Sequence, residues 1–217
     1  MLHVPRRPLA WRQRPWLLGL ARQLSAWCLE PNQMSWIGLG LAALGGGFLL
    51  CGEFGSGWLL LAALMVALRA LAHTLDGLMA IEGQQQVPSG PFVNELADRL
   101  ADTALFIPLG YAIGVPEWGW ALALLTMLTA YVRLLGGSLG LTQDFGGPLA
   151  KVQRLMVLGG GCLFGAVEGL WSATRISLWL TALVLTLGSL TTLVRRSLGV
   201  LKGLRSPQKA GSDRSTQ

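Results

Sequence analysis

The stretch from His73 to Asp102, "HTLDGLMAIEGQQQVPSGPFVNELADRLAD", places acidic side chains between two long apolar runs. Positions 90, 94, 98 and 102 are each about one turn apart, so Gly90, Asn94, Asp98 and Asp102 form one face of a helix. Carboxylates are costly at membrane depth, where they generally mark a functional site. Because carboxylate and amide oxygens are the ligands of hard cations, this face predicts a metal site.

The helix that precedes this face carries a second polar face. Arg69, His73 and Asp76 are spaced at i, i+4 and i+7, so their side chains point the same way. Gly77 and Gly90 remove side chains where a bulky ligand must approach. Two polar faces on adjacent helices, on the same side of the membrane, predict a pocket between them.

The composition points to an integral membrane protein. The 217 residues are 52% hydrophobic and 13% charged, whereas a soluble domain has roughly a quarter charged residues. The net charge is +6, and the basic residues cluster at both ends beside apolar helices. Anionic lipid headgroups are therefore the expected partner, and nucleic acid is not expected. Cys28, Cys51 and Cys162 each stand alone, which predicts no disulfide or metal role.

The expected fold is an all-α integral membrane protein with six transmembrane helices preceded by an N-terminal amphipathic interfacial helix. Residues 1–33 form the amphipathic segment, 34–200 the membrane domain and 201–217 a disordered polar tail. No cleavable signal peptide is expected. Spans of roughly 20 residues are expected at Met34–Gly52, Gly57–Ile81, Pro91–Val115, Trp118–Gly140, Val152–Ala173 and Ile176–Val194.

The distribution of charge between the expected spans predicts the orientation. The N-terminal segment has five arginines, the fourth connection has Lys151 and Arg154, and the tail from Arg195 has six basic residues. In the opposite connections the only basic residue is Arg175. By the positive-inside rule both termini and the acidic stretch face the cytoplasm, which suggests a multi-pass protein of the inner membrane.

Glycines recur at four-residue spacing in the expected spans. Gly161, Gly165 and Gly169 give two GxxxG steps, and Gly136 with Gly140 gives another. Small residues allow transmembrane helices to approach closely. We expect these glycines to pack helices within or between subunits, and a homodimer is the expected assembly.

The acidic stretch resembles, without gaps, the signature of the CDP-alcohol phosphatidyltransferases, D-x2-D-G-x2-A-R-x8-G-x3-D-x3-D. Five of its eight fixed positions match: Asp76, Gly77, Ala80, Gly90 and Asp98. His73 and Asn94 replace the first and third aspartates, and Ile81 replaces the arginine. "PNQMSWIGLGL" and "GPLAKVQR" also resemble the family's motifs at the starts of its first and fifth membrane helices.

The resemblance implies transfer of a phosphatidyl group from CDP-diacylglycerol to an alcohol in phospholipid biosynthesis, with Mg²⁺ or Mn²⁺ and release of CMP. It implies that Asp98 accepts the proton of the attacking alcohol and that Gly77, Ala80 and Gly90 make room for cytidine diphosphate. The expected metal ligands are His73, Asp76, Asn94, Asp98 and Asp102. Arg69 lies on the His73–Asp76 face and is expected on the diphosphate side, where Ile81 cannot contact a phosphate.

Basic residues near the expected pocket suggest the acceptor. Arg133 lies inside the fourth expected span, where an unpaired charge is costly. Lys151 and Arg154 share a face at the start of the fifth. These three side chains suit the phosphate of an acceptor such as glycerol 3-phosphate, although serine, inositol phosphate and other polyols stay open. The alternative is that Lys151 and Arg154 anchor the helix to lipid headgroups.

Two other functions are compatible with the sequence. The lost aspartates allow a catalytically degenerate family member that binds lipid nucleotide or pairs with an active transferase. A small transporter or scaffold would also use charges inside the membrane. The signature occurs once and the two halves show no inverted repeat, which disfavours a transporter.

Overall fold

The structure is a computed structural model that describes residues 14–27, 29–82, 88–172 and 174–205. Within these ranges the chain is helical apart from its connections. The elements are α1 (Pro15–Ala26), α2 (Pro31–Leu50), the 3-10 helix η2 (Cys51–Phe54), α3 (Ser56–Glu82), α4 (Gly90–Ala112), α5 (Pro116–Ser138), α6 (Lys151–Glu168) and α7 (Ile176–Arg205).

Four of these helices are long and apolar enough to cross a membrane. They are α2 together with η2, the Ser56–Ala80 part of α3, α5 and α7. The helices α4 and α6 lie where two further spans were predicted, but α4 carries Glu95, Asp98, Arg99 and Asp102. The chain is therefore a multi-pass membrane protein, and the prediction of six spans stays a prediction at α4 and α6.

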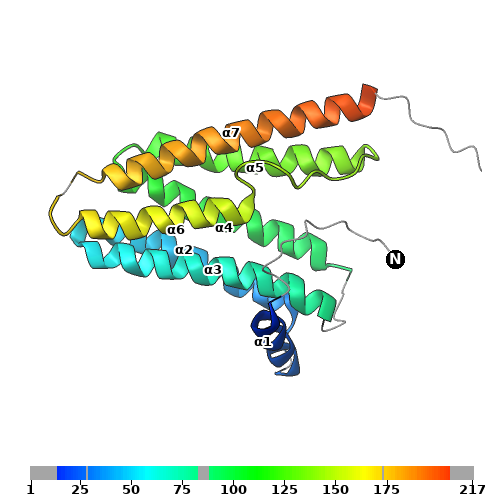
Figure 1. Cartoon of the computed structure of the whole chain (residues 1–217), viewed down its shortest axis with the longest axis horizontal. Coiled ribbons are helices and arrows are strands. Elements are labelled where there is room, and N and C mark those ends of the chain that lie inside the picture. The colour runs from blue at the N-terminus through cyan, green and yellow to red at the C-terminus, as the bar shows by residue number, and fades with distance from the viewer. Residues whose placement is uncertain (1–13, 28, 83–87, 173, 206–217) are drawn as a thin grey trace, which may run out of the picture.

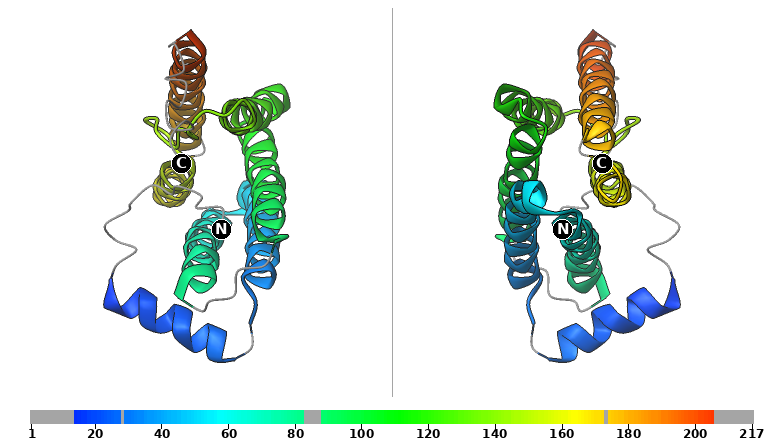
Figure 2. Two further views of the ribbon diagram at one scale, coloured as in Figure 1. Left: turned by 90° about the vertical axis from the view of Figure 1, so that its right-hand side faces the viewer. Right: turned by 90° about the vertical axis from the view of Figure 1, so that its left-hand side faces the viewer.

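The six long helices form a closed ring. Each packs on the next in the order α2, α3, α6, α7, α5, α4 and back to α2. Figure 1 shows that successive helices of the chain run in opposite directions, so that α2 is parallel to α4 and α5 to α7 within the ring, and the end-on views of Figure 2 show the ring as two rows. Residues that are distant in the sequence, on α3, α4, α5 and α6, therefore meet inside one bundle.

One half of the bundle is filled by an apolar core. Leu49, Leu105, Phe106, Leu158 and Leu185 are completely or almost completely buried there. Burial of such side chains contributes roughly 1.5–3 kcal/mol each to the apolar transfer energy. The other half of the bundle contains the charged face of α4, so the core fixes the helices at one end and leaves the polar side chains to meet at the other.

The helix α1 crosses the bundle axis beneath α2 and α3 (Figure 2). Leu17 and Ala21 are fully buried against these helices, while Trp16 and Trp27 are 60% and 71% exposed. A helix thus occupies Pro15–Ala26 of the segment predicted to be amphipathic, whereas residues 1–13 and 28 lie outside the described part. Exposed tryptophans beside a basic segment suit a membrane interface, and that location stays a prediction.

The structure corrects two details at the ends of helices. Gly140 ends α5 with φ +83°, and Leu141 N–H donates to the Gly136 carbonyl at 3.0 Å. Gly140 is therefore a helix-terminating glycine, and its predicted role in helix packing is wrong. The tail was predicted to begin at residue 201, but α7 continues to Arg205, and residues 206–217 lie outside the described part.

The GxxxG glycines of α6 pack inside the chain. A Cβ on Gly161 would lie 1.9 Å from Thr181 Oγ1 of α7, and one on Gly165 would meet Leu59 and Leu178. These two glycines therefore pack against other helices of the same chain. The glycines consequently give no support to a subunit interface, and the homodimer stays a prediction.

Replacing Gly161 should separate α6 from α7. We expect Gly161→Ala to destabilise the purified protein by about 1–3 kcal/mol, the usual range for overpacking a close helix contact, seen as a lower melting temperature in detergent. Gly160→Ala is the matched control, because nothing lies within 4 Å of its added Cβ. Equal melting temperatures for the two variants would contradict the α6–α7 packing described here.

Candidate functional site

A cavity of about 280 Å³ opens inside the ring, between α3 and α4 on one side and α5, α6 and α7 on the other. Five arginine or lysine side chains, three carboxylates and His73 line it. The first turn of α6 meets the third turn of α4, because Lys151 contacts Asp98. The cavity therefore extends from the end of the bundle as far as the third turn of α4.

The two polar faces predicted for α3 and α4 meet in this cavity. His73 Nδ1 lies 3.5 Å from Asp98 Oδ1 and 3.8 Å from Asp76 Oδ2, so both carboxylates lie next to one imidazole. The hydroxyl of Ser35 on α2 donates to Asp76 Oδ2 at 3.1 Å. Asp76 and Asp98 are 4% and 5% exposed. The two faces predicted from helical spacing therefore do meet, and the role of these residues as metal ligands stays a prediction.

Asp98 is surrounded by positive charge. Arg69 Nη2 donates to Asp98 Oδ1 at 2.7 Å, and Lys151 Nζ contacts the same oxygen. Arg69 is only 1% exposed, and its Nε and Nη1 have no hydrogen-bond partner among the described residues. Gly38 on α2 makes room for it, since a Cβ there would lie 2.7 Å from Nη1. Arg69 therefore supports Asp98 from behind the cavity wall and does not line the cavity itself.

Asn94 brings a buried amide oxygen to the same wall. Its Oδ1 is buried without a hydrogen-bond partner among the described residues, and it lines the same cavity as Asp76 and Asp98. In the described part of the chain no three His, Cys, Asp or Glu side chains are assembled as a metal site. Asp76, Asn94 and Asp98 nevertheless offer two carboxylates and one amide oxygen to this cavity, and these donor types suit a hard divalent ion.

Asp102 lies apart from this group, although it was predicted to be a metal ligand. Its Oδ2 is 3.3 Å from Arg99 Nη1 and 3.4 Å from Arg154 Nη2. It is 3% exposed and is absent from the cavity lining. Asp102 lies on the same face of α4 as Asp98, as helical spacing predicts. It is one turn deeper in the bundle, where its carboxylate pairs with the two arginines.

The residues predicted to make room for the nucleotide divide into two groups. Gly77 lines the cavity, as expected for a position where a ligand approaches. Ala80 and Gly90 do not line the cavity. Ala80 lies about one turn beyond Gly77 toward the end of α3, and Gly90 is the first residue of α4. The side chain of Ile81 lies outside the described part.

The opposite wall carries the predicted acceptor residues. Arg133, Lys151 and Arg154 all line the cavity. Arg133 Nη2 pairs with Glu95 Oε2 at 2.5 Å, Arg133 Nη1 donates to Gln143 Oε1 at 2.8 Å, and its guanidinium lies 5.0 Å from the Phe145 ring centroid. These contacts explain how a charge inside the fourth expected span is stabilised.

Arg196 on α7 also lines the cavity and was missed by the sequence analysis. Its guanidinium donates to the backbone carbonyls of Thr129 at 2.8 Å and Gly146 at 3.1 Å. The sequence held a signal for it, because Ser189, Thr192 and Arg196 continue the buried stripe of α7. By charge distribution alone, Arg196 is only one of the basic residues of the C-terminal tail.

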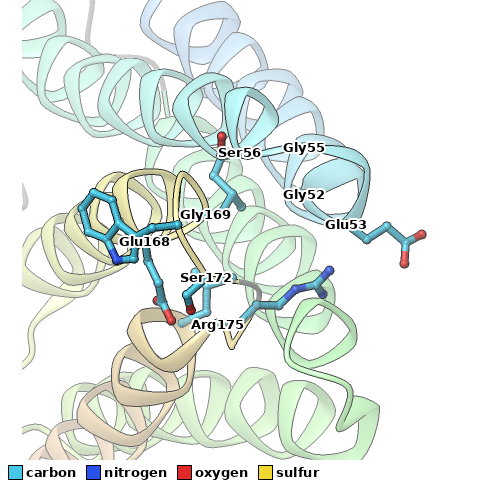
Figure 3. A pocket seen from close by; sticks show the side chains of 12 residues that line it. Gly52, Glu53, Gly55, Ser56, Glu168, Gly169, Ser172 and Arg175 are labelled. Atoms are coloured by element: carbon cyan, nitrogen blue, oxygen red, sulfur yellow. The ribbon is translucent and has the colours of Figure 1, made fainter.

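A second cavity, of about 390 Å³, lies at the opposite end of the bundle. Figure 3 shows Glu168 and Arg175 beside it, near the turn between α2 and α3. Glu168 accepts hydrogen bonds from the N–H groups of Ile176 and Ser177, both at 2.8 Å, and Arg175 donates to the Ala112 carbonyl at 2.6 Å. These charged groups therefore hold the start of α7 in place.

No family model matches the chain, but several proteins are similar to it. It is 31% identical over 182 residues to an uncharacterised protein of Aquifex aeolicus, covering 81% of this chain and 84% of that protein. It is 30% identical over 132 residues to the inner membrane protein YnbA of Escherichia coli, with coverage of 59% and 64%. It is 28% identical over 153 residues to the phosphatidylinositol phosphate synthase of Mycobacteroides abscessus, covering 66% of each.

Solved structures show the same fold. The phosphatidylinositol phosphate synthase of Mycobacterium tuberculosis in complex with manganese and citrate has a TM-score of 0.67 at 23% identity, covering 85% of this chain and 88% of that one. The same synthase with CDP-DAG bound also gives 0.67, at 22% identity, covering 93% and 98%. The chain therefore has the fold of these synthases, and its signature on α3 and α4 resembles that of the CDP-alcohol phosphatidyltransferases.

Proposed function

We propose that the chain transfers a phosphatidyl group from CDP-diacylglycerol to an alcohol and releases CMP. The observation that carries this proposal is a single cavity with Asp76, Gly77 and Asp98 on one wall and Arg133, Lys151 and Arg154 on the other. Such a cavity can hold a diphosphate and a second anionic reactant side by side. The similar structure with CDP-DAG bound supports the choice of donor.

The carboxylate wall is the place for the diphosphate of the donor. Asp76, Asn94 and Asp98 would hold one divalent ion, Mg²⁺ or Mn²⁺, which supplies positive charge beside the diphosphate. The similar synthase crystallised with manganese supports a divalent ion. His73 contacts both aspartates and fixes their relative position. Gly77 leaves the wall open for the nucleotide.

The transfer forms one bond and breaks another at the same phosphorus. The hydroxyl oxygen of the acceptor attacks the phosphorus that carries diacylglycerol, and the bond from this phosphorus to the bridging oxygen breaks. CMP leaves with the bridging oxygen, and the hydroxyl proton passes to Asp98. Asp98 belongs to the carboxylate wall and also contacts Lys151 of the opposite wall, so it lies where a base for the attacking alcohol is needed.

The basic wall favours a phosphorylated acceptor, for which glycerol 3-phosphate is our preferred candidate. Arg133, Lys151, Arg154 and Arg196 reach it from α5, α6 and α7. Guanidinium groups bind phosphate oxygens through pairs of charge-assisted hydrogen bonds. The Glu95 and Asp102 carboxylates hold Arg133 and Arg154 in place.

The chain is proposed to lie in the inner membrane with both termini in the cytoplasm and with α2 to α7 as its six spans. The C-terminal end of α7 lies toward the end of the bundle where α1 lies (Figure 1). That end has the basic residues Lys202 and Arg205, in agreement with the positive-inside rule. The likeness to YnbA supports an inner membrane location. A homodimer remains our proposal for the assembly.

Removing either carboxylate of the cavity should abolish the reaction. We expect Asp76→Ala and Asp98→Ala to lower CMP release from CDP-diacylglycerol by roughly a hundredfold or more, since each removes a group that binds or accepts charge in the transition state. The assay supplies glycerol 3-phosphate and a panel of other alcohols, with lipid products identified by mass spectrometry. Glu53→Ala, an exposed change at the opposite end of the bundle, is the control.

The alternative is a family member that binds lipid nucleotide without turnover. One observation favours it, because Arg69 and Lys151 already occupy the Asp98 carboxylate. Binding of CDP to the wild-type protein without release of CMP, for every acceptor supplied, would favour this alternative. Full activity in the two aspartate variants would refute the transferase assignment.

Neighbouring arginines on α7 allow the acceptor wall to be tested. Arg196 lines the cavity, whereas Arg195 is exposed outside it. We expect Arg196→Gln to raise KM for a phosphorylated acceptor roughly tenfold to a hundredfold, the effect of losing a hydrogen bond to a charged group. KM for CDP-diacylglycerol should change little. Arg195→Gln should leave both values unchanged, and an equal effect of the two variants would contradict the proposed acceptor wall.

A further inference from the structure

Three cationic or ionisable groups converge on one oxygen of Asp98. Arg69 Nη2 and His73 Nδ1 lie 2.7 and 3.5 Å from Oδ1, and Lys151 Nζ contacts the same atom. Arg69 and His73 come from α3, and Lys151 comes from α6. Two fixed positive charges therefore contact Asp98, the residue at the fourth acidic position of the signature.

The charge of the cavity has changed in the same direction. His73 and Asn94 replace two aspartates of the signature. Five arginine or lysine side chains and three carboxylates line the cavity, so its fixed charge is positive before any ligand binds. This positive charge would repel a second divalent ion, whereas it would attract a diphosphate.

The positions of Arg69 and Lys151 are both unfavourable for a positive charge. Arg69 is 1% exposed in an apolar span with two nitrogens lacking partners among the described residues, which is costly. Lys151 is the first residue of α6, where the helix dipole disfavours positive charge. Both positions are accounted for if the charge serves the site.

We propose that Arg69 and Lys151 are built-in cations that take the place of a second divalent ion, so that the cavity binds one Mn²⁺ or Mg²⁺ together with a nucleoside diphosphate. The inference rests on the proposed function for the identity of the diphosphate. It goes further by stating how many ions this chain needs and which side chains replace the others.

Counting bound ions tests the proposal directly. The full-length protein in nanodiscs is titrated with Mn²⁺ in the presence of saturating CDP, and free Mn²⁺ is followed by electron paramagnetic resonance. We expect one Mn²⁺ per chain, and Asp76→Asn should remove it. Two ions per wild-type chain, or none, would overturn the proposal.

A change in the built-in charge gives a second measurement. Lys151→Gln keeps a polar side chain of most of the length of lysine but removes its charge from Asp98, so we expect Mn²⁺ to bind about tenfold more tightly or a second ion to bind. Lys202→Gln, on the exposed end of α7 and outside the cavity, should leave binding unchanged. An unchanged Mn²⁺ titration in Lys151→Gln would contradict the role of Lys151.

The two proposals fail in different ways. If CDP and two Mn²⁺ ions bind and CMP is released in the transferase assay, the built-in cations are refuted while the transferase assignment stands. If one Mn²⁺ binds with CDP but no acceptor yields CMP, the built-in cations stand and the transferase assignment fails.

Discussion

The pairing of Asp98 with Arg69 and Lys151 is the interaction on which the organisation of the site depends. A buried charge is tolerated only when a partner compensates for it, and removing one partner of such a pair costs about 3–5 kcal/mol. Arg69 belongs to α3, Asp98 to α4 and Lys151 to α6. These ion pairs therefore fix three helices of the ring relative to one another at the cavity, where the apolar core of the other half does not reach.

A second set of ion pairs extends this arrangement around the ring. Glu95 on α4 pairs with Arg133 on α5 and with Arg99 of its own helix, and Asp102 pairs with Arg99 and Arg154. Each carboxylate of α4 thus positions a basic side chain on the opposite wall. The wall proposed to bind the donor and the wall proposed to bind the acceptor are consequently held together by the same few turns of α4.

The sequence predicted the helices and the acidic wall because both follow from spacing. Helical periodicity alone brings Asp76 and Asp98 to facing positions once α3 and α4 are neighbours. Periodicity does not say which partner a side chain meets, and for that reason Asp102 was assigned to a metal although Arg99 and Arg154 hold it. The depth at which α6 begins was also beyond the sequence, so the contact of Lys151 with Asp98 was not foreseen.

The departures from the family signature are consistent with one another in the folded chain. The almost fully buried guanidinium of Arg69 is accommodated by Gly38, where a Cβ would lie 2.7 Å from Nη1. Here the replacement of an aspartate by His73 occurs together with a buried arginine one turn earlier on the same helix. Since that arginine binds the aspartate that the signature retains, Asp98, the substitutions read as an exchange of cations within a preserved site.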